Sequence, residues 1–261
     1  MNGELAQLVS LVSYGNAFLD GLVASSALSS QPEVSSTAAV TFVYPSGPRS
    51  VTEWANHLRT QGVERLELDA TGQLSGDSTN DAWPRGMQHA LRGRAGGLIV
   101  AQTKRKSEVW HGYWDVVPED ERHDGLVWNV RYSIAFTGPR IGLSHPTVVD
   151  ATRSLARSLE RIRQFAEVNE QPHWEQIYRA AATVLTSKEE PSDADYALSP
   201  HAPEAAKLLL RATAEGWGFG GMGSWNDLVF DDPDATANYN RVTSEHYRAT
   251  LAAIDAASNA R

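Results

Sequence analysis

Four residues with proton-transfer or anion-binding side chains are expected on one face of a β-hairpin. His111, Tyr113 and Asp115 alternate with apolar residues, and Arg131 lies in a second alternating stretch over residues 126–136. Successive side chains of a strand point to opposite faces, so pairing the apolar faces gathers the four polar residues on the other face. The register that we predict puts Arg131 opposite His111. Such a group could bind an anionic substrate and move protons, and a merely solvated sheet face is the alternative.

A second set of candidate ligand-binding residues surrounds a predicted strand–helix junction. Ser46, Arg49 and Ser50 precede a predicted helix, and Asp69 ends the next predicted strand. If the two strands are parallel neighbours, all four residues lie where open α/β sheets bind ligands. The free N–H groups of the helix start would attract an anion there. The alternative is that Ser50 is a helix cap, in a capping box with Glu53.

The segment 216–227 has five glycines in eight positions, interleaved with large side chains. Glycine is favoured where a positive φ or a very close backbone approach is needed. One interpretation is that the glycines let tryptophans pack tightly between helices. The other is that the loop presents Trp225, Asn226 and Asp227 to a partner.

Motifs for a metal or an organic cofactor are weak, and we expect neither. Asp69, Asp77 and Asp81 could offer oxygen ligands to Mg²⁺ or Ca²⁺, but they lack the spacing of a calcium loop. The glycine-rich segment follows a predicted helix, whereas a dinucleotide fingerprint follows a strand. The spacing of Arg241 and His246 is similar to the Arg-x4–6-His motif of the HEPN ribonuclease superfamily. This composition produces about two such spacings by chance, so a helical nuclease is the weakest of three function hypotheses.

The elements that must position these residues predict an α+β fold. Alternating and apolar runs indicate strands at 38–44 and 66–68 around a helix, which suggests a βαβ unit followed by an antiparallel meander that contains the hairpin. A further helix is expected over residues 82–92. Helical periodicity dominates after residue 146, with the last helix beginning near Thr243.

Three regions follow from this pattern. Residues 1–28 form an N-terminal helix that docks on the helical domain, 37–142 form the small mixed sheet domain, and 146–261 form the helical, bundle-like domain with the loop 216–227.

Composition narrows the function further. The 261 residues carry a net charge of −9, eight tryptophans and no cysteine. The negative charge argues against non-specific nucleic-acid binding, and the lack of cysteine fits a reducing cytoplasm. The first basic residue is Arg49, so we expect neither a secretory signal nor membrane association. Arginine-rich basic content suggests a bacterial origin.

These features favour an acidic, cytoplasmic bacterial protein-binding module of the immunity or antitoxin type, with a basic protein as its partner. The alternative is an enzyme that acts on an anionic small molecule through the His, Tyr and Arg side chains of the sheet face.

Overall fold

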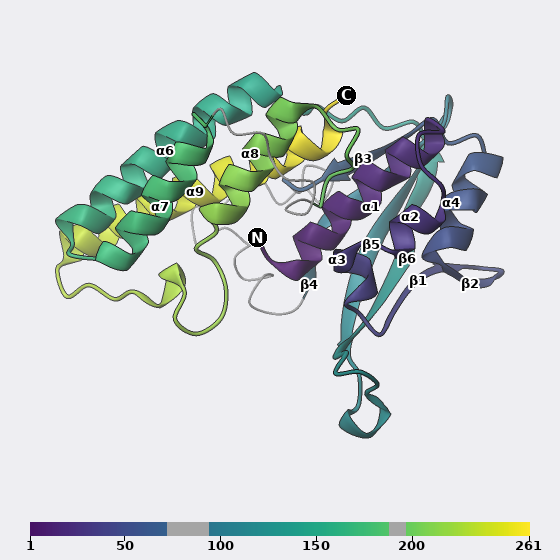
Figure 1. Ribbon diagram of the computed structural model, residues 1–261, viewed down its shortest axis with the longest axis horizontal. Helices are drawn as coiled ribbons and strands as arrows, with labels where there is room; N and C mark the ends of the chain where they lie inside the picture. The colour runs from purple at the N-terminus through teal and green to yellow at the C-terminus, as the bar shows by residue number, and fades with distance from the viewer. Residues whose placement is uncertain (72–93, 188–196) are drawn as a thin grey trace.

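A mixed six-stranded sheet lies beside a group of long helices in the computed structural model, which describes residues 1–71, 94–187 and 197–261 (Figure 1). The α+β class is therefore confirmed. The helices are α1 (Gly3–Leu19), α2 (Ser26–Ser29), α3 (Pro32–Ser35), α4 (Val51–Thr60), α6 (Val148–Val168), α7 (Pro172–Val184), α8 (Glu204–Glu215) and α9 (Pro233–Asn259), with 3-10 turns η2 (Glu119–Glu121) and η4 (Trp225–Asp227). The strands are β1 (Ala39–Tyr44), β2 (Gly47–Ser50), β3 (Arg65–Asp69), β4 (Arg94–Gln102), β5 (Lys106–Val116) and β6 (Trp128–Pro139). The helix predicted over 82–92, and Asp77 and Asp81, lie outside the described residues.

The strand order is β2-β1-β6-β5-β4-β3, and it corrects the predicted βαβ unit. Three strands separate β1 from β3, so the two are not neighbours. The place beside β1 is taken by β6, which pairs in parallel with β1 over residues 129–133 and antiparallel with β5 on its other side. The remaining pairs are antiparallel, and β3 to β6 form the expected meander.

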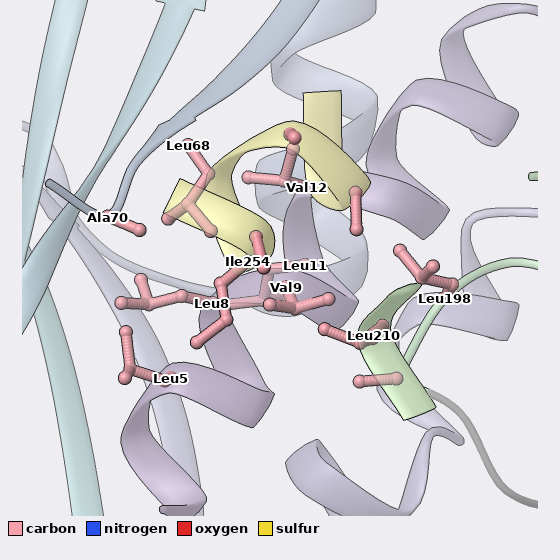
Figure 2. Packing of buried hydrophobic residues seen from close by; sticks show 14 of the residues in the cluster. Leu5, Leu8, Val9, Leu11, Val12, Leu68, Ala70, Leu198, Leu210 and Ile254 are labelled. Atoms are coloured by element: carbon pink, nitrogen blue, oxygen red, sulfur yellow. The ribbon is translucent and has the colours of Figure 1, made fainter. Parts of the chain in front are cut away.

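Helix α1 lies between the sheet and α9, and apolar residues occupy more than one of its faces. Leu8, Leu11 and Val12 are completely buried. Figure 2 shows them among Leu68 of β3 and Ile254 of α9. Burying each such side chain contributes roughly 1.5–3 kcal/mol, so this helix holds the two parts of the molecule together. The buried residues form one continuous cluster across the sheet and the helices, and the proposed domain limits stay predictions.

The edge of the sheet at β3 is covered by side-chain amides. Asn16 of α1 accepts a hydrogen bond from the N–H of Leu66 and donates one to its carbonyl. Asn259 of α9 makes the same pair of bonds with Leu68. These amides occupy backbone groups that another strand could otherwise join, so the edge is closed to further pairing there.

The helical part follows the predicted pattern except at the start of its last helix. Helix α9 begins at Pro233, because Asp232 caps the N–H groups of Asp234 and Ala235 and proline suits the first turn. The polar stretch that follows hides the apolar periodicity, which becomes clear only near Thr243. Across the described ranges, none of the helices has the combination of length and apolar character needed to cross a membrane.

Candidate functional site

The four residues predicted on the hairpin do share one face of the sheet. The pairing is Arg131 opposite Tyr113, and His111 opposite Ser133, so the register is shifted by two residues from the prediction. The observed register continues into the loop, where the Val117 N–H donates a hydrogen bond to the Val127 carbonyl. An even shift keeps each side chain on its predicted face.

The contacts within this group are open to water. The ring of His111 lies 4.8 Å from that of Tyr113, in an edge-to-face arrangement. Arg131 Nη2 lies 3.7 Å from Asp115 Oδ2, and these side chains are 55% and 67% exposed. Solvent screens such a pair, which contributes about 0–1 kcal/mol. The arrangement suits adaptable surface contacts better than proton transfer in a site that excludes water.

The distal half of the hairpin carries exposed side chains on both of its faces, although Val130 is buried, and Figure 1 shows this half projecting from the rest of the molecule. Tyr113 and Arg131 lie on one face, while Val116 and Trp128 on the other are 54% and 38% exposed. Beyond them the loop 118–125 carries four carboxylates and one arginine, and its η2 turn buries no side chain. The hairpin thus offers aromatic and apolar groups beside an acidic tip.

The second predicted set is divided between opposite edges of the sheet. Ser46, Arg49 and Ser50 lie at β2, whereas Asp69 ends β3. The predicted proximity of Asp69 to the other three is therefore wrong, because it depended on β1 and β3 being neighbours. Ser50 caps α4 in the expected capping box. The Arg49 guanidinium lies 4.5 Å from the centre of the Tyr44 ring.

Asp69 instead lies near a buried charged cluster that the sequence analysis missed. His145 Nδ1 is 2.6 Å from Asp255 Oδ2 of α9, and His145 Nε2 is 3.6 Å from Glu67 Oε1 of β3. The other oxygen of Asp255 accepts a hydrogen bond from the N–H of Ala70. His145 thereby connects the last helix to the edge strand. A signal was present in the sequence, because Asp255 interrupts an apolar helical run and a buried carboxylate needs a partner.

The pKa values show that His145 is a cation at neutral pH. Burial alone would lower the pKa of His145, but hydrogen bonds and charge attraction from Asp255 and Glu67 outweigh burial and raise it to about 9. Burial raises the pKa of Asp255, and the adjacent imidazolium opposes that rise. A histidine held in its charged form is poorly suited to act as a general base at pH 7. Within the described ranges, no group of three or more His, Asp or Glu side chains is arranged to hold a metal ion.

The glycine-rich segment packs Trp225 inside, as the first interpretation predicted, and leaves Trp217 partly buried. Trp225 is completely buried and its indole N–H donates to Thr243 Oγ1 at 2.8 Å. A Cβ at Gly218 would lie 2.6 Å from the Tyr178 hydroxyl, so only glycine fits. The expectation that the loop presents Trp225 to a partner is corrected, because burial takes that side chain out of reach. Asn226 is half-buried, and the exposed Asp227 accepts hydrogen bonds from two N–H groups of its own turn.

The two residues of the weak nuclease motif lie in different environments. Arg241 is exposed and pairs with Glu245 at 3.1 Å. His246 is buried, with Nδ1 3.1 Å from Ser158 Oγ and Nε2 3.1 Å from the Gly216 carbonyl. Burial lowers the pKa of His246 to about 4, so this imidazole is neutral and fixed between its two partners.

The chain has no significant match among protein-family models, curated proteins or solved structures. The function is therefore inferred from the geometry of the molecule alone.

Proposed function

We propose that the chain is a protein-binding module that contacts a basic partner through the distal half of the β5–β6 hairpin. The observation that carries this proposal is the exposure of aromatic and apolar side chains on both faces of a projecting strand pair. A strand pair that served only the core would expose polar groups on one face and cover the other. Tyr113, Trp128 and Arg131 are of the types that dominate binding energy at interfaces.

The backbone of the hairpin is hydrogen-bonded within itself up to the loop, which favours its use in binding. Its backbone is paired up to Val116 and Trp128, and Val117 N–H adds a 2.7 Å bond to Val127. The rings of Trp114 and Trp128 lie 6.1 Å apart, edge to face. A preformed element loses little conformational entropy when it binds, so more of the contact energy appears as affinity.

The charge at the tip determines which kind of partner fits. Three successive carboxylates, Glu119–Glu121, occupy η2 on a chain whose net charge is −9. Such a surface attracts and orients a basic protein and repels an acidic one. Immunity proteins and antitoxins that neutralise basic toxins are one class with this chemistry. We place the module in the bacterial cytoplasm, because a chain without cysteine has no disulfide that a reducing environment would break.

The enzyme and nuclease alternatives receive less support from the geometry. The Arg131–Asp115 pair is more than half exposed, and a proton-transfer site gains its strength from excluding water. His246 would have to leave a buried position between Ser158 and Gly216 to reach a nucleic acid.

The test is affinity capture from a lysate of the organism that encodes the chain, with two charge-matched variants. In the hairpin variant, each residue of Glu119–Glu121 is changed to lysine. In the control variant, the exposed Glu170, Glu215 and Asp231 are changed to lysine, which alters the net charge equally at other sites.

We expect the natural chain and the control variant to retain one stoichiometric basic protein, and the hairpin variant to lose it. The retained complex should weaken as salt is added, because exposed charges are screened. Equal retention by both variants would exclude the hairpin tip as the contact.

A further inference from the structure

Basic side chains gather at the end of the sheet opposite the hairpin tip. Strand β5 runs from Lys106 to Val116, so these two ends lie about 35 Å apart at the usual rise per strand residue. The β4–β5 turn and its neighbours form what we call the basic end: Arg65, Lys104, Arg105, Lys106, Arg140 and Arg261. The chain is acidic overall, so this concentration of cations is a local feature that composition does not explain.

Carboxylates do not balance the basic end. Glu64 lies 3.9 Å from both Lys104 Nζ and Arg140 Nη1, so these two cations share one carboxylate, while Arg65 lies 3.7 Å from Glu67. Within the part of the chain that the structure describes, no ion pair involves Arg105 or Lys106, although both are exposed. Their charged groups are therefore available to a ligand.

The cations also repel one another. Burial lowers the pKa of Arg65, and the neighbouring charges of Arg261 and Arg140 lower it further against the opposing attraction of Glu67. The Arg140 N–H donates to the Arg105 carbonyl at 3.0 Å, and Arg261 reaches the Glu64 carbonyl at 3.4 Å, so backbone contacts hold these residues together. The positive charge of this group would attract an anion to the same end of the sheet.

The surface at the basic end is hollowed. A shallow depression of about 600 Å³ is lined by Gly62–Glu64 and Thr103–Lys106. That volume lies within the usual range for small-molecule sites. The turn at its rim is fixed, because Thr103 Oγ1 accepts hydrogen bonds from the N–H groups of Arg105 and Lys106.

We propose that the basic end binds a small molecule that carries a diphosphate or triphosphate group. Guanidinium groups match phosphate oxygens with paired hydrogen bonds, and lysines add charge without strict geometry. A depression at the ends of a few strands suits a compact polyanion, whereas a nucleic acid needs a longer basic track. This site is separate from the hairpin contact and does not depend on it.

The experiment is isothermal titration of the full chain with inorganic tripolyphosphate at low ionic strength. The test variant combines Arg105→Glu with Lys106→Glu. The control variant combines Arg157→Glu with Arg248→Glu, which changes the net charge equally on exposed positions of α6 and α9. Circular dichroism and thermal unfolding check that both variants fold.

We expect the test variant to bind tripolyphosphate at least about tenfold more weakly than the natural chain, and the control variant to bind within about twofold of it. Amide NMR shifts should move at residues 103–106 and stay in place at 119–124. The proposal is overturned if the natural chain does not bind tripolyphosphate. It is also overturned if the test and control variants lose affinity equally, because that result would show non-specific charge attraction. A single-stranded oligonucleotide that binds more tightly through the same two residues would overturn the small-molecule class.

Discussion

Among individual side chains, His145 is expected to have a large effect on stability. Replacing it with alanine leaves the buried Asp255 without its cation, because the imidazole is the charged group in contact with that carboxylate. Removing one partner of a buried pair costs about 3 kcal/mol or more. We expect His145→Ala to lower the free energy of unfolding by that amount in urea titrations. His173→Ala, on an exposed position of α7, is the control and should change it by less than about 0.5 kcal/mol.

The same residue gives the molecule a specific pH dependence. The pKa of His145 is raised to about 9 in the folded state, against about 6.5 in an unfolded chain. Between about pH 6.5 and 9 the folded state binds this proton and the unfolded state does not, so stability falls as the pH rises through this window. The stabilisation is complete below about pH 6.5 and is lost above about pH 9. We therefore expect the difference in unfolding free energy between the natural chain and His145→Ala to shrink from pH 6.5 to 9. A difference that stays constant over this window would show that His145 holds no additional proton.

Single residues also show where sequence reasoning succeeded and failed at the candidate site. Strand alternation was enough to bring His111, Tyr113 and Arg131 to one face, since only parity mattered. It could not show that the hairpin projects beyond its covering helices, which determines how exposed those residues are. The contact of His145 with Asp255 joins residues 110 positions apart, and no local pattern specifies such a distance.

Among the elements, the loop between α8 and α9 offers a sharp test of packing. Gly218→Ala would place a Cβ 2.6 Å from the Tyr178 hydroxyl and 3.0 Å from Trp225 Cβ, in a fully buried environment. Overpacking of this kind costs about 1–3 kcal/mol. Gly221→Ala is the matched control, because nothing lies within 4 Å of its added methyl group.

We expect thermal unfolding to show a clear loss of stability for Gly218→Ala. The Gly221 variant should be neutral, or more stable by up to about 1 kcal/mol, because alanine restricts the unfolded chain. Similar melting curves for the two variants would refute the claim that close packing against Tyr178 and Trp225 requires glycine at position 218. Fluorescence of the buried Trp225 gives a second, local measurement.

Local signals predicted most elements, but they did not predict the neighbours of each strand. The capping box at Ser50 and the alternation of β6 define their own elements directly. Strand order is a different kind of property, because consecutive strands are usually but not always neighbours, and the exceptions depend on contacts between distant parts of the chain. Strand β6 pairs with both β1 and β5. It therefore occupies the place beside β1 where the short helical connection predicted β3.

Taken together, the molecule has opposite charges at opposite ends of one sheet. The acidic tip of the hairpin lies beyond Val116, and the basic end begins at Lys106 of the same strand. The two ends are separated by more than the screening length of about 8 Å in physiological salt, so the two proposed binding events are independent of each other. The two proposals can therefore fail or succeed independently.

Native mass spectrometry of the full chain, gently purified from the organism that encodes it, separates the two proposals. The natural chain should carry the mass of a basic protein and that of a small phosphorylated compound. Lysine at each residue of Glu119–Glu121 should remove the protein and keep the small molecule, because the altered charges lie at the far end of β5. Arg105→Glu with Lys106→Glu should do the reverse. If a retained small molecule is instead lost in His111→Ala, the open face of the hairpin is a ligand site, and the chain is better described as an enzyme.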